Sequence, residues 1–293
     1  MIKFSMIFPG QNIQNIKMLQ ILYKNYPIMR NTFSEASYYL KYDLWKKISK
    51  RSFNNKKISQ IEILVSSISI FRVWKKIITI NPKIIVGHSL GQYSAYVCSK
   101  ILKFSDAIKI VKYREKIMKS NPGFMYAIIS KKKNINIILK KISTNKKIFI
   151  ACINSNTQIV VTGKKKYIKN IYHICKKFKT KKIIKLPTKY ISHCKSMKNI
   201  KKLLFKKCIC IPFKKSKYQI LDSSELKFIQ NPIQSKNFLI NQLCKTIQWN
   251  KTINLIISKK IKYFLEVGTS NFLNNFFIKK KKYIPLSIKK YLI

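Results

Sequence analysis

The sequence predicts an α/β main domain into which a small α+β subdomain is inserted. An apolar run at 84–86 leads through a glycine-flanked turn straight into a helix-like stretch, the strand–turn–helix pattern of an α/β domain. Between 124 and 187 the predicted order is β-α-β-β-α-β, which is that of a ferredoxin-like unit. With 293 residues and 46% hydrophobic content, the chain can bury a substantial core.

The first 123 residues alternate strand patterns with apolar positions at helical spacing. The predicted elements are, in order, a buried strand at 1–8, helical spacing from about 13 to 40, one long helix at 58–78, a strand at 84–86, a helix opening at 92–97 and a helix at 105–119. We expect Ser105 or Asp106 to cap the last helix, because short polar side chains accept hydrogen bonds from free N–H groups. Asn121-Pro122-Gly123 then breaks the pattern.

The second half holds the subdomain and the return to the main domain. The predicted subdomain elements are strands at 124–129, 148–153, 158–162 and 182–186 and helices at 134–142 and 164–178. Asn154-Ser155-Asn156 is predicted as the hairpin turn between the middle strands. The chain returns to the main domain from about Tyr190, with another strand expected near 263–267. The expected boundaries are 1–122 and 189–293 for the main domain and 123–188 for the subdomain.

The charge balance is extreme, with 62 Lys and Arg against 8 Asp and Glu and a formal net charge of +54. Such a balance is typical of proteins that meet nucleic acid, anionic membranes or acidic partners. The lysines are scattered through every segment, however, and form no tail, stripe or DNA-binding motif. We therefore expect most of them to be solvated surface, with no specific nucleic acid partner. The charge suits anionic substrates and acidic partner proteins.

The sequence also bears on where in the cell the protein is expected to act. Met1–Phe8 is too short for a secretory apolar region, and no apolar stretch reaches the length of a membrane span. Seven cysteines without a signal peptide are typical of reduced thiols. Cys208 and Cys210 lie too far from other Cys or His for a zinc site. We expect a cytoplasmic, metal-free protein with no membrane association.

The segment Gly87-His88-Ser89-Leu90-Gly91-Gln92 has the pattern of a nucleophile elbow. In such an elbow a strand turns sharply into a helix and exposes a serine hydroxyl. Glycine is needed two residues before and after the serine, because a side chain there would collide with the neighbouring strand or helix. The helix that follows directs its free N–H groups at the serine. Ser89 is therefore a candidate covalent nucleophile.

A serine hydroxyl needs a positioned base to take its proton, and the chain has three histidines. His88 adjoins the serine and is expected to point elsewhere because of the turn. His173 falls within the second predicted helix of the subdomain and is expected at the surface or in packing. His193, in a loop after the last subdomain strand, is the candidate general base. Its neighbour Cys194 has no turn to expose it and is interpreted as packing.

The acidic residues decide between two classes of serine enzyme. An α/β-type hydrolase places an Asp or Glu between the serine and the histidine in chain order. Only Asp106 and Glu115 lie between Ser89 and His193, and both belong to the helical region just after the elbow. A Ser/His dyad, in which a backbone or amide oxygen holds the imidazole, fits better than a triad.

Five separated motifs together resemble the malonyl-CoA:acyl-carrier-protein transacylases of bacterial fatty acid synthesis. They are Phe8-Pro9-Gly10-Gln11, the elbow, Tyr113-Arg114-Glu115, Ser192-His193-Cys194 and Gln248-Trp249, in the order that the family has them. The resemblance covers nearly the whole chain. It implies an α/β-hydrolase-like main domain with the ferredoxin-like insertion.

The resemblance also implies roles for single residues. Ser89 would be malonylated by malonyl-CoA and then attacked by the phosphopantetheine thiol of the carrier protein, with His193 as general base and then acid. The backbone N–H groups of Gln11 and Leu90 would form the oxyanion hole. Arg114 would bind the malonyl carboxylate through both of its terminal nitrogens.

Three further expectations follow from the resemblance. Gln248 would hold the ring of His193 through its main-chain carbonyl. The partner would be an acidic acyl carrier protein, and malonyl-CoA and CoA would be substrate and product, with no bound cofactor. We also expect the chain to act as a monomer. The alternative interpretation of Arg114 is a helix-surface salt bridge, and that of Gln248 is an ordinary residue at a helix start.

The chain departs from the family pattern at several places. Gln92 stands where Glu is usual, Thr269-Ser270 where Pro-Gly is common, and Asp222-Ser223 where two asparagines are frequent. The loop at Asn121–Gly123 is shorter than usual. Tyr190-Ile191-Ser192-His193 is similar to the pattern of methylmalonyl-selective polyketide acyltransferase domains, so the choice of acyl group stays open.

Two other functions are alternatives to the transferase. If the protein were a serine thioesterase or esterase, we would expect an acid that orients the histidine, and Arg114 would have no catalytic or binding role. A catalytically degenerate basic scaffold predicts damaged catalytic positions, whereas Ser89, His193 and Arg114 are all intact. Malonyl transfer is the function that the motifs favour.

Overall fold

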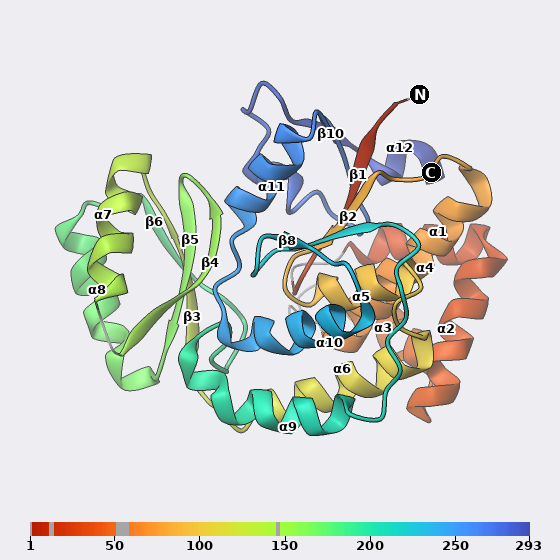
Figure 1. The fold of residues 1–293 in the computed structure, drawn as a ribbon, viewed down its shortest axis with the longest axis horizontal. Coiled ribbons are helices and arrows are strands. Elements are labelled where there is room, and N and C mark those ends of the chain that lie inside the picture. Colours follow the sequence, from red (N-terminus) through yellow and green to blue (C-terminus); the bar gives the residue numbers. More distant parts are fainter. Residues whose placement is uncertain (1, 12–14, 51–58, 145–146) are drawn as a thin grey trace.

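The computed structural model describes residues 2–11, 15–50, 59–144 and 147–293 of the chain. Within these residues the strands form two separate sheets, one with six strands and one with four. The smaller sheet and its two helices lie at one end of the long axis in Figure 1, and the larger sheet with its helices makes up the rest. A mixed α/β main part with a smaller α+β part is the predicted fold class.

The larger sheet forms the centre of the main domain. Its strands are, in spatial order, β10 (Ile284–Leu286), β9 (Tyr263–Glu266), β1 (Phe4–Phe8), β2 (Ile84–Gly87), β7 (Gln219–Asp222) and β8 (Lys227–Phe228). Every neighbouring pair is parallel except β7 and β8. Each residue of β1 and β2 is buried, as expected of central parallel strands covered on both faces. The strands predicted at 1–8, 84–86 and 263–267 are thus confirmed.

Helices cover both faces of this sheet. The helices of the main domain are α1 (Ile16–Asn25), α2 (Pro27–Leu40), α3 (Leu44–Ser49), α4 (Gln60–Ile77), α5 (Gly91–Cys98), α6 (Phe104–Met118), α9 (Lys198–Cys208), α10 (Pro232–Asn241), α11 (Trp249–Ser258) and α12 (Ile288–Leu292). Met6 and Phe8 of β1 pack in the cluster that includes α4, α5 and α6, whereas Ile7 packs with α11. This alternation follows from the period of two along a strand. No helix in the described part of the chain combines the length and apolar character needed to cross a bilayer.

Two helical predictions needed revision. The apolar spacing from 13 to 40 is divided between α1 and α2, because the chain is extended at Tyr26 and Pro27 starts a new helix. Ser105 and Asp106 do not cap α6: the helix begins at Phe104, and its N-cap is Lys103, without a side-chain cap. Ile13 and Ile58, where two helical patterns were expected to begin, lie outside the described residues. The short helix α3 was not predicted.

The subdomain has the predicted order of elements. Its strands are β3 (Phe124–Ile129), β4 (Ile148–Ser155), β5 (Gln158–Gly163) and β6 (Lys182–Lys185), and its helices are α7 (Lys132–Ser143) and α8 (Ile168–Lys177), the latter preceded by the 3-10 turn η1 (Lys165–Tyr167). The sheet order is β4-β5-β3-β6, with all pairs antiparallel. The hairpin turn is at Asn156-Thr157 and not at Asn154-Ser155-Asn156, because β4 extends through Ser155.

The two parts are joined where the chain leaves and re-enters the main domain. Pro122 and Tyr190 form an antiparallel bridge, and the Gly123 N–H donates to the Lys189 carbonyl at 3.0 Å. A second junction pairs β4 with the segment before α11, where the Ile247 N–H donates to the Ala151 carbonyl at 2.9 Å. We propose that the boundaries lie at 122/123 and 188/189, beside the first junction.

The surface charge leads to a prediction about stability. Three ion pairs join described residues, Arg72–Glu35, Lys109–Asp106 and Lys245–Glu225, so most of the 62 Lys and Arg lack an acidic partner. Repulsion between such charges is screened by salt, with a Debye length of about 30 Å at 0.01 M and about 8 Å at 0.15 M. We expect the melting temperature to rise with ionic strength in scanning calorimetry. A melting temperature that stays constant or falls in both NaCl and KCl would contradict this expectation.

Candidate active site

Ser89 sits in a sharp turn between β2 and α5. Its φ angle is 53°, in the left-handed region that side chains seldom adopt. A Cβ at Gly87 would lie 2.1 Å from the Gln92 nitrogen, and one at Gly91 would lie 2.1 Å from the Phe8 carbonyl oxygen. Only glycine fits at either position. The strand–turn–helix geometry predicted for the elbow is therefore present, with the hydroxyl only partly buried.

The structure brings Ser89 and His193 together. The Oγ of Ser89 lies 2.6 Å from Nε2 of His193, and Nδ1 of His193 lies 2.9 Å from the main-chain oxygen of Gln242. A carbonyl oxygen only accepts hydrogen bonds, so Nδ1 carries the proton of a neutral ring. Nε2 is then free to accept the hydroxyl proton of Ser89. This is the arrangement of a dyad whose base is held by a backbone oxygen.

The expectation that Gln248 holds the His193 ring was wrong. Gln248 is the N-cap of α11, and its carbonyl accepts from both the N–H and the hydroxyl of Thr252, at 2.9 Å each. An N-cap carbonyl is committed to the first turn of its own helix. Gln242 follows α10 and begins the 3-10 turn η3 (Gln242–Cys244). Carbonyl groups at a helix C-terminus lack partners inside the helix, and one of them is therefore available to His193.

The surroundings of His193 keep its ring neutral. The residue is 2% exposed, and its φ of 58° is also in the left-handed region. Burial lowers the pKa of His193 from 6.5 to about 3, with smaller lowering by the charge of Arg114, while the hydrogen bond to Gln242 acts in the opposite direction. A neutral imidazole is the form that accepts a proton.

This lowered pKa predicts the pH dependence of the free enzyme. An imidazole with the usual pKa of 6.5 would be protonated, and lost as a base, as the pH falls through that value, whereas His193 stays neutral until near pH 3. We expect kcat/KM for the reaction at Ser89 to stay flat from about pH 8 to about pH 5. Initial rates at constant ionic strength measure this. A decline with an apparent pKa near the usual histidine value would show that the ring is protonated normally.

Arg114 lies within the main domain rather than on a helix surface. It is 3% exposed on α6, and one terminal nitrogen donates to Oε1 of Gln60. Its Nε is buried without a partner, and no carboxylate of the described residues pairs with the guanidinium. Asp106 pairs with Lys109 instead, and Glu115 accepts from the Gln60 N–H. The surface salt bridge considered for Arg114 is therefore not formed.

Gln11 and Leu90 lie on the two segments that meet at the serine. A Cβ on Gly10 would be 2.7 Å from the His88 carbonyl oxygen and 3.6 Å from Cβ of Ser89, so the chain at Gly10, just before Gln11, lies against the elbow. Leu90 directly follows Ser89 and is the N-cap of α5. We propose that the N–H groups of Gln11 and Leu90 form the oxyanion hole, because one adjoins Gly10 and the other directly follows Ser89.

The other two histidines and Cys194 lie in surroundings that do not suit a catalytic base or nucleophile. Nε2 of His88 lies 3.0 Å from the side-chain oxygen of Asn154, whose nitrogen donates to Gln158. His88 is thus a donor at Nε2 and no base for the serine. His173 is exposed on α8. Cys194 is buried, and burial raises the pKa of its thiol to about 11, which disfavours the reactive thiolate.

The departures from the family pattern have local explanations. The side-chain oxygen of Gln92 accepts the Gly87 N–H at 2.9 Å, a bond that an amide makes as well as a carboxylate. The hydroxyl of Thr269 accepts the N–H of Asn15, the N-cap of α1, at 2.9 Å. The hydroxyl of Ser223 donates to the Gly87 carbonyl at 3.0 Å and so supports the strand that enters the elbow.

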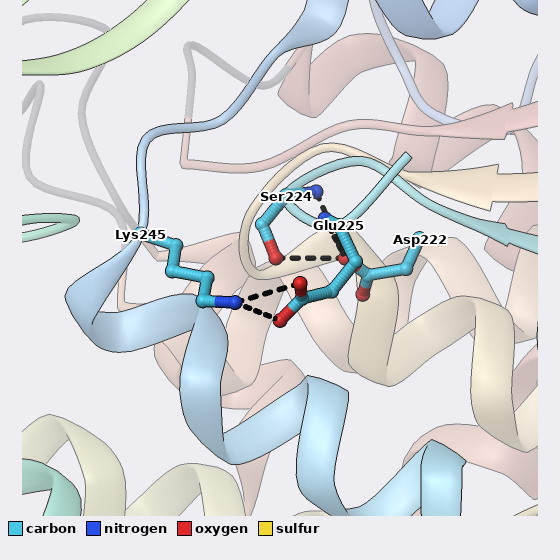
Figure 2. A network of polar contacts seen from close by, with 4 residues as sticks. All are labelled: Asp222, Ser224, Glu225 and Lys245. Atoms are coloured by element: carbon cyan, nitrogen blue, oxygen red, sulfur yellow. Dashed lines mark hydrogen bonds and ion pairs between the residues drawn. The ribbon is translucent and has the colours of Figure 1, made fainter. Parts of the chain in front are cut away.

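A polar network fixes the segment that contains Gln242, the residue whose carbonyl is hydrogen-bonded to His193. Figure 2 shows Oδ1 of the buried Asp222 accepting from the N–H and hydroxyl of Ser224 and from the N–H of Glu225. The carboxylate of Glu225 in turn binds Nζ of Lys245 at 2.6 and 2.7 Å. Lys245 directly follows η3, so the network ties the turn after β7 to the segment that contains Gln242. The pair is partly exposed, and such pairs contribute at most about 1 kcal/mol.

Comparison with known proteins identifies the family. The family model described as "Acyl transferase domain" matches residues 5–281. The chain belongs to the acyl transferase family. Within it, the chain is 38% identical to a malonyl CoA-acyl carrier protein transacylase of Buchnera aphidicola subsp. Baizongia pistaciae, over 98% of this chain and 96% of that protein. It is 30% identical to the protein of the same name from Escherichia coli strain K12, over 92% and 89%.

Solved structures agree with this assignment for the acyltransferase. An acyl carrier protein S-malonyltransferase from Vibrio cholerae has a TM-score of 0.89 and 28% identity, covering 97% of this chain and 96% of its own. A malonyl-transacylase solved in complex with a type II polyketide synthase acyl carrier protein has a TM-score of 0.90 and 28% identity, covering 97% and 95%. The expected kinship to malonyl-CoA–acyl carrier protein transacylases and the predicted fold class are confirmed.

Sequence reasoning missed two residues of this acyltransferase site. Gln242 provides the oxygen next to His193, and its only sequence signal is a position at the end of a helical segment. Gln60, which accepts from Arg114, is a fully buried amide in a helix whose other buried residues are mostly apolar. A glutamine at the start of a largely apolar helix is the signal that could have indicated a buried hydrogen-bonding role.

Proposed function

We propose that this acyltransferase moves a malonyl group from malonyl-CoA to the phosphopantetheine thiol of acyl carrier protein and so supplies fatty acid elongation. The relatives named malonyl CoA-acyl carrier protein transacylase and the structural neighbour solved with a carrier protein support this substrate pair. One acyl group passes from the CoA thioester to the free thiol of the carrier, and the chemistry requires a nucleophile, a base and donors for the oxyanion. It requires no redox or metal step.

The observation that carries the proposal is the buried guanidinium of Arg114. A buried charge without a counter-ion is unfavourable, and no carboxylate of the described residues compensates this one. The malonyl group ends in a carboxylate, which can bind a guanidinium through two parallel hydrogen bonds. The charge of Arg114 also lowers the pKa of His193, so a carboxylate bound to Arg114 would lie within electrostatic range of the dyad.

The proposed reaction has two symmetrical steps. The Oγ of Ser89 attacks the thioester carbonyl, and its proton passes to Nε2 of His193. The C–S bond breaks, and the departing CoA sulfur takes that proton. The carrier thiol then gives its proton to His193 and attacks the malonyl ester, and Ser89 leaves with the proton. In both steps the N–H groups of Gln11 and Leu90 stabilise the oxyanion.

The proposal extends to the conditions of the reaction. An acyl carrier protein of acidic character would be attracted by a chain with a net charge of +54. The cysteines are free thiols in the described residues, which suits a reducing cytoplasm. We further propose that the protein acts as a monomer, binds only its two substrates and has no nucleic acid or membrane partner.

Intact-protein mass spectrometry tests the proposal. The protein is mixed with malonyl-CoA, and the mass is measured before and after addition of holo acyl carrier protein. A malonyl adduct that disappears as malonyl-carrier forms is the expected result. Formation of the adduct itself releases one equivalent of CoA. Continued CoA release beyond one equivalent without a carrier would indicate a thioesterase, and neither adduct nor release would indicate an inactive scaffold. Either of these results would refute the transferase.

A further inference from the structure

The side chain of Tyr190 lies between two parts of the site that are proposed to bind different ends of the acyl group. Its backbone is fixed at the junction of the two domains by the bridge to Pro122. The ring is 8% exposed. Its hydroxyl is 2.9 Å from Nε2 of Gln60 and 2.8 Å from Oε1 of Gln11. Tyr190 thus contacts both the residue that binds Arg114 and the loop proposed for the oxyanion.

These hydrogen bonds have a single possible direction. A guanidinium only donates, so Oε1 of Gln60 is the acceptor for Arg114. The Gln60 amide nitrogen must then donate to the Tyr190 hydroxyl, whose own proton goes to Oε1 of Gln11. Each group donates to the next, from a permanent cation to the oxyanion loop. Aligned hydrogen bonds in a buried site strengthen one another.

The row of hydrogen bonds from Arg114 through Gln60 and Tyr190 to Gln11 is called the relay below. Both ends of this relay depend on the Tyr190 hydroxyl. Gln60 is fully buried, and without the hydroxyl its amide nitrogen would keep only a 3.6 Å contact to the sulfur of Met118. The amide could then reorient and release Arg114. At the other end, the Gln11 side chain is exposed and would lose a bond that holds it against the buried domain junction.

We propose that Tyr190 is a positioning residue that couples recognition of the acyl carboxylate to stabilisation of the oxyanion. Through Gln60 it sets the orientation of the Arg114 guanidinium, and through Gln11 it sets the loop whose N–H group meets the oxyanion. This inference rests on the proposed function, because it assigns the carboxylate of the substrate to Arg114.

The test compares two acyl donors in the Tyr190→Phe variant. Transfer from malonyl-CoA depends on both sides of the relay, the Gln60–Arg114 side for the carboxylate and the Gln11 side for the oxyanion. Acetyl-CoA has no carboxylate and depends only on the Gln11 side. We expect kcat/KM for malonyl transfer to fall about tenfold, the usual effect of one hydrogen bond, and kcat/KM for acetyl transfer to fall about threefold or less. The malonyl-to-acetyl ratio therefore decreases. A general loss of folded enzyme would lower both rates equally and leave this ratio unchanged.

Two further variants control for loss of a hydroxyl and for coupling. Tyr26→Phe removes a hydroxyl that donates to the Leu292 carbonyl at 2.9 Å, far from the dyad in sequence, and should leave both rates and their ratio as in the wild type. The double variant Tyr190→Phe/Gln11→Ala should lose less than the product of the two single losses, because both changes break the bond between Tyr190 and Gln11.

The outcomes separate this inference from the function on which it rests. A wild-type protein that forms no malonyl adduct refutes the proposed function. A wild type that transfers malonyl, together with a Tyr190→Phe variant of unchanged malonyl-to-acetyl ratio, overturns the relay and leaves the function standing. Rate losses that multiply in the double variant also overturn it.

Discussion

Replacement of Ser89 by alanine is expected to abolish the malonyl adduct and to lower transfer by at least about 10³-fold, because the remaining groups bind and polarise the thioester but supply no nucleophile. The Oγ of Ser89 makes one hydrogen bond, to His193. Alanine keeps the Cβ that the left-handed φ of 53° already accommodates. The loss should therefore be chemical, with little change in the melting temperature. Intact mass and initial rates of malonyl-carrier formation measure it.

Ser94→Ala is the matched control for this change. Ser94 lies on α5 in the same helix that follows the elbow, and its hydroxyl is buried without a partner. Removal of that hydroxyl should leave the adduct and the rate intact. If Ser89→Ala still carried a malonyl group, another residue would be the nucleophile and the dyad mechanism would be wrong.

Replacement of Arg114 by alanine is expected to change which acyl group the enzyme prefers. Truncation of one partner of a buried charge pair costs about 2–5 kcal/mol, so kcat/KM for malonyl transfer should fall about 30- to 5,000-fold. Acetyl transfer, which has no carboxylate to bind, should change far less. Arg114→Lys should recover only a small part, because an ammonium cannot make two parallel bonds to a carboxylate. The two donors are compared by initial rates.

Arg72→Ala is the corresponding control. Arg72 is also an arginine of the main domain, but it already has a partner in Glu35 at 2.6 Å and lies about one-third exposed. Its loss should leave the malonyl-to-acetyl ratio unchanged. An unchanged ratio in Arg114→Ala would mean that the guanidinium does not bind the acyl carboxylate.

Much of the fold could be predicted because its signals are local. The fully buried strand β2 appears as a continuous apolar run and β1 as an apolar run interrupted by Ser5, and the periods of two and 3.6 separate strands from helices in the subdomain. The errors have local causes as well. Pro27 could start a helix within an apparently continuous pattern, and the hairpin turn moved to Asn156-Thr157 because β4 is longer than its apolar run.

In the candidate site, too, some residues could be predicted from local sequence and others could not. The elbow follows from the sequence alone, because Gly87 and Gly91 act on their immediate neighbours, and the sequence limits the choice of base to three histidines. The packing of the folded chain is what places the carbonyl of Gln242, and not that of Gln248, against His193. It also decided that the buried amide of Gln60 connects Arg114 to Tyr190. Backbone preferences act over a few residues, whereas these partners meet only through the packing of distant helices and loops, and residue spacing does not encode which of many carbonyls or amides will be nearest.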